Sequence, residues 1–371
     1  MRIQRVQVDH YRIPLPVVLS DSTHGDMSHF GLATVRVLTD DGIEGIGYSY
    51  VVGDIGGGAL HAMLAQDLAP VLPGRDSDDR ERIWHELWWR VHFVGRGGLA
   101  SFALAAVDVA LWDAAAKQAS KPWWKLLGGW RKPVPAYAGG IDLQFPLDRL
   151  LHQADGFRDA GFRAIKMKVG RPPYKEDADR ALAMRAHLGD GFPLMADANM
   201  QWLPHQAIQA ARALSDADLY WIEEPTIPDD YAAHARIARE GGLPVATGEN
   251  LHSIHEFEHM LDLGEVAFPE PDLVTLGGVT PWLKVAHMCE ARNLPVTTHG
   301  VHDLHVHLLA AVPNASYLEV HGFGLERFME EPLAVRDGTV LPPERPGHGV
   351  GLLWDRLEPH RRSPSVVLTR D

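Results

Sequence analysis

Three segments decide the fold of this chain: PLMADAN (residues 193–199), LYWIEEP (219–225) and PVATGEN (244–250). Each is a short apolar run with the character of a strand, and each carries a carboxylate near its end. These carboxylates, Asp197, Glu223 and Glu249, are spaced 26 residues apart, with a helix-like segment in each interval. Equal spacing of this size indicates a repeated strand–helix unit.

The same unit repeats on both sides. The further strand-like segments are VPAYAGG (134–140), AIKMKVG (164–170), VAFPEPDLV (266–274), LPVTTHG (294–300) and SYLEVHG (316–322). Amphipathic helical stretches, such as 147–161 and 176–191, lie between most of them. Eight strands alternating with helices predict an α/β fold whose parallel sheet closes into a TIM barrel. An open doubly wound sheet is the alternative, but units of even length favour closure, and no glycine-rich nucleotide fingerprint follows any strand.

The length of the chain predicts a second domain, because its 371 residues exceed the roughly 250 of a barrel. Residues 1–125 predict an α+β capping domain, with strands up to residue 50 and helices near 57–70, 77–93 and 98–119. The barrel is expected at 126–321. The segment 322–371 lacks a clear eighth helix and is expected to return to the capping domain. The predicted fold is therefore a modified TIM barrel, (β/α)7β, with an α+β cap.

Composition narrows the classes of partner. A net charge of −14 argues against nucleic acid and against an anionic membrane surface, although a bound cation would still permit an anionic substrate. Cys289 is the only cysteine, so no intrachain disulfide can form and the cytoplasm is the expected compartment. The first residues alternate like a strand and do not resemble a signal peptide. The most apolar run, 101–112, is interrupted by Asp108, so no membrane span is expected.

The three spaced carboxylates predict a metal site. Acids at the C-terminal ends of neighbouring barrel strands converge on one mouth, and they repel each other unless a cation lies between them. Oxygen ligands of this kind suit Mg²⁺ or Mn²⁺ better than zinc. Asp197, Glu223 and Glu249 are therefore candidate ligands of Mg²⁺, with Mn²⁺ as the alternative.

Two lysines are expected inside the barrel. Lys166 and Lys168 lie two residues apart on the segment 164–170, and side chains at i and i+2 share one face of a strand. The apolar residues between and beside them would then contact the surrounding helices. Asp197 and Glu223 are the obvious partners of the two ammonium groups. A neighbouring positive charge lowers a lysine pKa, so Lys168 is predicted to act as a base near neutral pH.

A histidine and two further acids are expected at the same mouth. His299 ends the segment 294–300, and Asp272 is expected on the strand before it. A carboxylate in that place can orient one ring nitrogen and leave the other for a substrate. Glu319 lies on the segment 316–322 and, if protonated, could donate a hydrogen bond to a substrate oxygen; an ordinary strand-end carboxylate is an equal alternative.

The remaining polar candidates are less specific. Asn199 and Asn250 are either substrate contacts or turn residues. His302, His305 and His307 fall in a predicted helix and are expected to be packing or surface residues.

The order and spacing of these residues resemble one known family. The set is Lys166-x-Lys168, Asp197-x-Asn199, Glu223-Glu224-Pro225, Gly248-Glu249-Asn250, Asp272, His299 and Glu319. It resembles the mandelate racemase subgroup of the enolase superfamily along the whole barrel, and the split cap agrees. The muconate-lactonizing subgroup is a poorer match, because it carries a lysine on the sixth strand, where this chain has Glu270-Pro271-Asp272.

The resemblance implies roles for these residues. Asp197, Glu223 and Glu249 would bind Mg²⁺, and Lys168 would be one base. The dyad of His299 and Asp272 would be the opposing acid/base, and Glu319 would contact the substrate carboxylate. The resemblance also implies a symmetric homo-oligomer.

Two bases on opposite faces of a metal-bound carboxylate predict removal of the proton α to that carboxylate, with the developing enediolate stabilised electrostatically. If the next carbon carries a hydroxyl, water leaves and a 2-keto-3-deoxy acid forms. Without a leaving group, reprotonation gives racemisation or epimerisation.

The segments 20–30 and 50–58 are expected to be loops over the barrel mouth, and their polar residues, including Ser22 and His24, favour a hydroxylated substrate. These loops and the segment 92–113 resemble acid sugar dehydratases of the galactarate/talarate type. The predicted activity is therefore dehydration of an aldarate or aldonate. A racemase or epimerase of a 2-hydroxy acid or amino-acid derivative is the alternative. A binding protein without activity is disfavoured, because no member of the site is missing.

Overall fold

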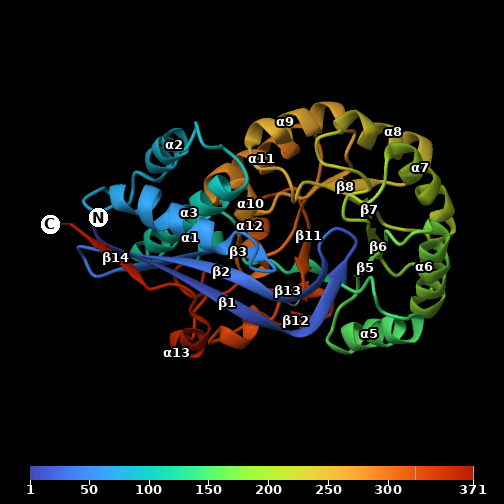
Figure 1. The fold of residues 1–371 in the computed structure, drawn as a ribbon, viewed down its shortest axis with the longest axis horizontal. Coiled ribbons are helices and arrows are strands. Elements are labelled where there is room, and N and C mark those ends of the chain that lie inside the picture. Colours follow the sequence, from blue (N-terminus) through green and yellow to red (C-terminus); the bar gives the residue numbers. More distant parts are fainter. Residues whose placement is uncertain (322, 371) are drawn as a thin grey trace.

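A computed structural model describes residues 1–321 and 323–370 of the chain. Figure 1 shows a barrel of strands ringed by helices and, beside it, a smaller cap that carries both termini at its outer edge.

Within the described residues, eight parallel strands form the barrel: β4 (Val134–Gly139), β5 (Ile165–Lys168), β6 (Leu194–Asp197), β7 (Ile222–Glu223), β8 (Val245–Thr247), β9 (Phe268–Pro269), β10 (Val296–Thr298) and β11 (Ala315–Val320). They are hydrogen-bonded in the order β10-β11-β4-β5-β6-β7-β8-β9, and β9 and β10 also lie side by side, so the sheet is nearly closed. The predicted strands are confirmed, each shorter than its segment. The predicted modified TIM barrel is confirmed, and the alternative of an open doubly wound sheet is wrong.

Helices cover the outside of the barrel: α5 (Leu147–Asp159), α6 (Tyr174–Leu188), α7 (Pro204–Ala213), the 3₁₀ turn η3 (Ser215–Ala217), α8 (Tyr231–Gly241), α9 (Ile254–Leu263), α10 (Leu273–Leu276), α11 (Val279–Ala291) and α12 (His302–Ala311). Only short elements follow β11: η4 (Leu325–Phe328), β12 (Val335–Arg336), β13 (Thr339–Val340), α13 (Trp354–Leu357), η5 (Glu358–His360) and β14 (Val366–Thr369). Among the described residues, no long helix closes the eighth unit, as the sequence predicts.

The cap is an antiparallel sheet in the order β14-β1-β2-β3, built from β1 (Ile3–Asp21), β2 (Gly25–Thr39) and β3 (Glu44–Val52) together with β14. Its helical elements are α1 (Gly57–Met63), the π turn η1 (Leu64–Leu68), the 3₁₀ turn η2 (Ala69–Val71), α2 (Arg80–Arg90), α3 (Leu99–Gln118) and α4 (Trp123–Leu126). Because β14 pairs with β1, the end of the chain lies against its beginning.

The helix α3 is long and apolar enough to cross a membrane, but 83% of its apolar window is buried inside the protein. It lies directly on β3, where Gly45 and Gly47 leave room for it. A Cβ at either position would meet a carbonyl oxygen of α3 at 2.1 or 2.0 Å. The apolar character of α3 is therefore that of a core helix.

The segment 20–30 corrects one prediction. It is not an open loop: β1 and β2 continue through it as a long hairpin whose turn is only Ser22–His24. Leu19 pairs with Met27, and both side chains are buried. The amide of Leu143, which follows β4, donates to the carbonyl of Ser20 at 3.1 Å and holds the ribbon against the barrel. The tip of this hairpin is thereby fixed at the barrel mouth.

Candidate active site

The three spaced carboxylates meet at the barrel mouth. Asp197 and Glu223 end β6 and β7, and Glu249 follows β8 by two residues. One oxygen of each lies within 4.8 Å of the others, and the first two side chains are fully buried. Burial, together with the charge of Asp197, raises the pKa of Glu223 to about 8 and also raises the pKa of Glu249. Crowded buried carboxylate oxygens are the donor set that a hard divalent cation requires, so the residues present fit Mg²⁺.

The two lysines of β5 point into the barrel, and the apolar residues beside them pack in the surrounding core. The Nζ atom of Lys166 lies 2.5 Å from Oε1 of Glu223 and 2.8 Å from Oε1 of Glu319. Lys168 donates a hydrogen bond to Oδ2 of Asp197.

The predicted lowering of the Lys168 pKa is wrong. Burial and the charge of Lys166 do disfavour the ammonium form of Lys168. The carboxylates of Asp197, Glu249 and Glu223 outweigh both effects, and the pKa of Lys168 is raised above its usual value. Charge neutralisation of those carboxylates is therefore a condition for Lys168 to act as a base.

The His299–Asp272 dyad is present, but Asp272 does not lie on a strand. It follows β9 and caps the N-terminus of α10, where its carboxylate accepts from the amide of Val274 at 2.7 Å. Pro271 has no N–H, so the strand ladder ends before Asp272. Nδ1 of His299 lies 3.1 Å from Oδ2 of Asp272, and its Nε2 lies 3.1 Å from Oε2 of Glu249.

The dyad has a further partner that the sequence did not reveal. The hydroxyl of Tyr50, at the end of β3 in the cap, donates to Oδ2 of Asp272 at 2.9 Å. Burial lowers the pKa of His299, but the charges of Glu249 and Glu319 and the bond with Asp272 raise it to about 10 overall. These contacts favour the protonated imidazolium form of His299.

Glu319, on β11, is an ionised carboxylate and not the protonated donor considered from the sequence. Its Oε1 pairs with Lys166, and its Oε2 accepts from the amide of Gly300 at 3.1 Å. Burial raises the pKa of Glu319, but the positive charges of Lys166 and His299 more than offset this and hold that pKa well below its usual value. By contrast, burial raises the pKa of Glu270 well above its usual value, and both of its oxygens are buried without a hydrogen-bond partner among the described residues.

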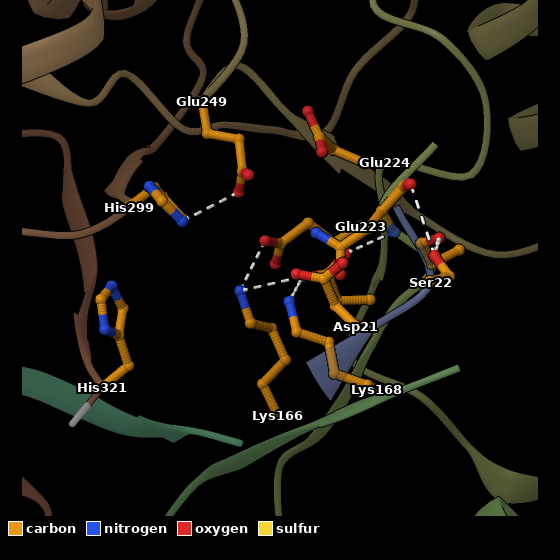
Figure 2. Close-up of polar contacts among 12 residues, drawn as sticks. Asp21, Ser22, Lys166, Lys168, Glu223, Glu224, Glu249, His299 and His321 are labelled. Atoms are coloured by element: carbon orange, nitrogen blue, oxygen red, sulfur yellow. Dashed lines mark hydrogen bonds and ion pairs between the residues drawn. The ribbon is translucent and has the colours of Figure 1, made fainter. Parts of the chain in front are cut away.

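The sequence predicts that Ser22, His24 and Asn199 contact the substrate, and the structure shows what each side chain contacts within the protein. The hydroxyl of Ser22 donates to the carbonyl of Ala198 at 2.7 Å, so it fastens the hairpin tip to the barrel. His24 is partly exposed, with Nδ1 2.9 Å from Oδ2 of Asp21, and the side-chain oxygen of Asn199 is buried without a partner among the described residues. Figure 2 shows Asp21, Ser22 and Lys168 on one side of the carboxylates, and His299 and His321 on the other.

The histidines of α12 are packing residues, as predicted. His305 and His307 are fully buried, and Nδ1 of His305 bonds the carbonyl of Gly300 at 3.0 Å. Asn250 donates from its side chain to Glu224 at 2.8 Å, which favours a bracing role.

Comparisons with known proteins assign the family. Residues 3–128 match the N-terminal domain of the mandelate racemase/muconate lactonizing enzymes, and residues 149–356 match the enolase C-terminal domain-like family. The chain therefore belongs to the mandelate racemase subgroup of the enolase superfamily.

Individual relatives are sugar acid enzymes. The chain is 55% identical to a 3,6-anhydro-α-L-galactonate cycloisomerase of Streptomyces coelicolor, over 96% of this chain and 98% of the relative. It is 37% identical to the L-talarate/galactarate dehydratase of Salmonella typhimurium, over 94% and 88%. A racemase of Streptomyces coelicolor with bound magnesium is 54% identical, with a TM-score of 0.95 over 97% of this chain and all of that chain. An L-talarate dehydratase of Polaromonas with Mg and L-glucarate is 35% identical, with a TM-score of 0.93 over the full length of both chains. The chain is thus an enzyme of this family, and Mg²⁺ is its cofactor.

Proposed function

We propose that the protein removes the proton α to the carboxylate of a sugar acid and expels the oxygen on the neighbouring carbon, with a 3,6-anhydro-galactonate type of acid as its substrate. The observation that carries this proposal is the placement of Lys168 and His299 on opposite sides of one carboxylate cluster. A base on one face and an acid on the other suit a β-elimination.

Each residue has a defined task in this reaction. Mg²⁺, held by Asp197, Glu223 and Glu249, would supply positive charge to the substrate carboxylate. Lys168 takes the α-proton once the carboxylates beside it are neutralised. His299, oriented by Asp272 and Tyr50, gives its proton to the departing oxygen. Lys166 holds Glu319 in place at the wall of the site.

The leaving oxygen decides the name of the reaction. In a 3,6-anhydro acid, the oxygen on C3 also binds C6. Loss of the C2 proton and cleavage of the C3–O bond open the ring, and the oxygen remains on C6 as a hydroxyl. The enol then becomes a 2-keto-3-deoxy acid, and no atom is lost, so the reaction is an isomerisation. The likeness at 55% identity to a cycloisomerase of such an acid supports this substrate.

Dehydration of an open-chain acid sugar is the second candidate. It uses the same two proton transfers, but the C3 oxygen leaves as water. The 37% identity to a talarate/galactarate dehydratase and the likeness to a dehydratase complexed with L-glucarate favour it. The homo-oligomer and the cytoplasmic location stay predictions.

Proton NMR in D₂O tests the proposal. The Mg²⁺-loaded protein is mixed in turn with 3,6-anhydrogalactonate, galactonate, galactarate and simple 2-hydroxy acids. A 2-keto-3-deoxy product from the anhydro acid supports the cycloisomerase, and the same type of product only from an open-chain acid supports the dehydratase. Loss of the α-proton signal without a new skeleton would point to a racemase or epimerase and would overturn both.

A further inference from the structure

Lys168 is the last residue of β5, and its backbone faces a place where the neighbouring strand β4 has already ended. At its C-terminal end, β4 bonds β5 through the amide of Gly140, which donates to the carbonyl of Lys166 at 2.9 Å. In a parallel ladder, the N–H and C=O of Lys168 point toward the same neighbour as those of Lys166. Buried backbone groups of this kind need partners, so something other than a strand must supply them.

Two buried side chains supply these partners. The carboxylate of Asp142, in the segment after β4, accepts from the amide of Lys168 at 3.0 Å. The guanidinium of Arg180, on α6, donates to the carbonyl of Lys168 at 3.2 Å. Asp142 is 1% exposed and Arg180 is 4% exposed, so water does not replace these contacts. Both backbone polar groups of Lys168 are thus held by side chains from outside its own strand.

The two supporting segments are themselves anchored. Asp177 lies 3.3 Å from the guanidinium of Arg180, and its other oxygen accepts from the amides of Gly170 and Arg171 at 2.7 Å each. These bonds tie the turn after β5 to α6. The segment after β4 is tied to the cap hairpin, because it pairs there with Ser20. Each support therefore has a second contact that keeps it in place.

The position of the Lys168 ammonium depends on its backbone more than that of Lys166 does. Nζ of Lys166 lies 2.5 Å from Glu223 and 2.8 Å from Glu319. Among the described residues, the ammonium of Lys168 forms an ion pair with Asp197 alone. Lys168 must give up this ion pair to act as a base, and the direction of its side chain is then determined by its backbone.

We propose that Asp142 and Arg180 are positioning residues, which hold the backbone of Lys168 and through it place the amino group for removal of the α-proton. This inference rests on the proposed function and deepens it. A misplacement of about 1 Å at a reacting group can cost about 100-fold in rate. Loss of the Asp142 contact should therefore slow proton removal and leave the binding of Mg²⁺ and of the substrate unchanged.

Exchange of the α-proton by the His299→Asn protein tests the proposal, because it reports proton transfer by Lys168 alone. The Mg²⁺-loaded protein is mixed in D₂O with the sugar acids of the NMR assay. Adding Asp142→Ala should lower the maximal exchange rate by about 100-fold, with KM and the affinity for Mg²⁺ unchanged. Asp142→Asn keeps an acceptor oxygen of the same reach and should retain most of the rate. Asp142→Glu keeps the charge but adds a methylene group, so it should also lower the rate, and it replaces Asp142→Ala if that variant does not fold.

Asp108→Ala is the matched control. Asp108 is also 1% exposed, and its carboxylate accepts from the amide of Thr280 on α11 at 2.9 Å. Its loss removes the same kind of buried contact from another pair of elements, so the exchange rate should not change. A second readout is hydrogen exchange of the Lys168 amide, followed by mass spectrometry of fragments that span it. This amide should exchange faster in Asp142→Ala than in the wild-type protein or in Asp142→Asn.

Two results would overturn the proposal. One is a Lys168 amide that stays as protected in Asp142→Ala as in the wild-type protein. The other is an α-proton exchange rate that Asp142→Ala leaves unchanged or lowers no more than Asp108→Ala does. Failure of the proposed function is distinct, because the His299→Asn protein would then exchange the α-proton of no sugar acid, while protection of the Lys168 amide would still depend on Asp142.

Discussion

Gly139→Ala should disable the site by the addition of one methyl group. Gly139 ends β4, beside β11. A Cβ there would lie 2.6 Å from Oε1 of Glu319 and 3.0 Å from Cβ of His321. Comfortable contacts between such atoms begin near about 3.5 Å, so the Glu319 carboxylate must retreat by about 1 Å. The same oxygen lies 2.8 Å from Nζ of Lys166, and this ion pair cannot survive the shift unchanged.

The displacement of the Glu319 carboxylate determines how far kcat/KM should fall. A misplacement of about 1 Å in an active site can cost about 100-fold in rate, and we expect kcat/KM to fall by about that factor. Insertion of a methyl group into a packed interior typically costs about 1–3 kcal/mol, so the free energy of unfolding should fall by a similar amount. The assays are the rate of 2-keto acid formation by the Mg²⁺-loaded protein and urea denaturation of the same preparation.

Gly156→Ala is the control for this substitution. Gly156 lies on the exposed face of α5, and a Cβ there would meet no atom within 4 Å. Alanine is a better helix former than glycine by about 0.5–1 kcal/mol, so this variant should be slightly more stable and fully active. A folded Gly139→Ala protein with the kcat/KM of the wild type would refute the reasoning, because the position of Glu319 would then not matter to the reaction.

Three further predictions concern the carboxylates, the two bases and the buried histidines. Asp197→Asn should lose activity and the Mg²⁺-induced rise in Tm together; unchanged Mg²⁺ affinity, measured by calorimetry, would place the ion elsewhere. Lys168→Ala should abolish both product formation and α-proton exchange with D₂O, whereas His299→Asn should abolish product formation while Lys168 still exchanges the α-proton; full activity in His299→Asn would exclude the dyad. Burial lowers the pKa of His305 to about 4 and that of His307 to about 3, against 6.5 when exposed. Below pH 6.5 the unfolded chain binds protons that the native state does not, so stability should fall as the pH drops toward these values, by up to about 1.4 kcal/mol per pH unit for each histidine. His307→Gln should show a shallower slope in urea denaturation between pH 6 and pH 4, and an identical slope would contradict this assignment.

The barrel and its carboxylates could be predicted because their signals are local. Strand period, spacing along the chain and the i, i+2 rule are sufficient to bring Lys166, Lys168 and the three spaced acids to one mouth. The hairpin through residues 20–30 could not be predicted, because its pairing depends on the register of two long strands and on burial against the barrel.

The protonation states of two site residues could not be predicted from the neighbouring sequence either. Those of Lys168 and Glu319 depend on charges that several strands bring together through space. The surroundings of Tyr50 and His321 could not be predicted from the sequence either, because they also depend on segments that come together only in the folded protein. The contact of Tyr50 with Asp272 exists only when the cap docks on the barrel, and only the structure shows that His321 has no hydrogen-bond partner among the described residues.

The cap therefore contributes contacts to the proposed site and is not only a cover. Tyr50 bonds the carboxylate that orients His299, and the hairpin tip bonds the backbone of the barrel at Ala198 and Asn199 through Ser22 and Thr23. Contacts between the cap and the barrel therefore lie on both sides of the carboxylate cluster. The acids and bases proposed for α-proton removal, in contrast, all lie on the barrel.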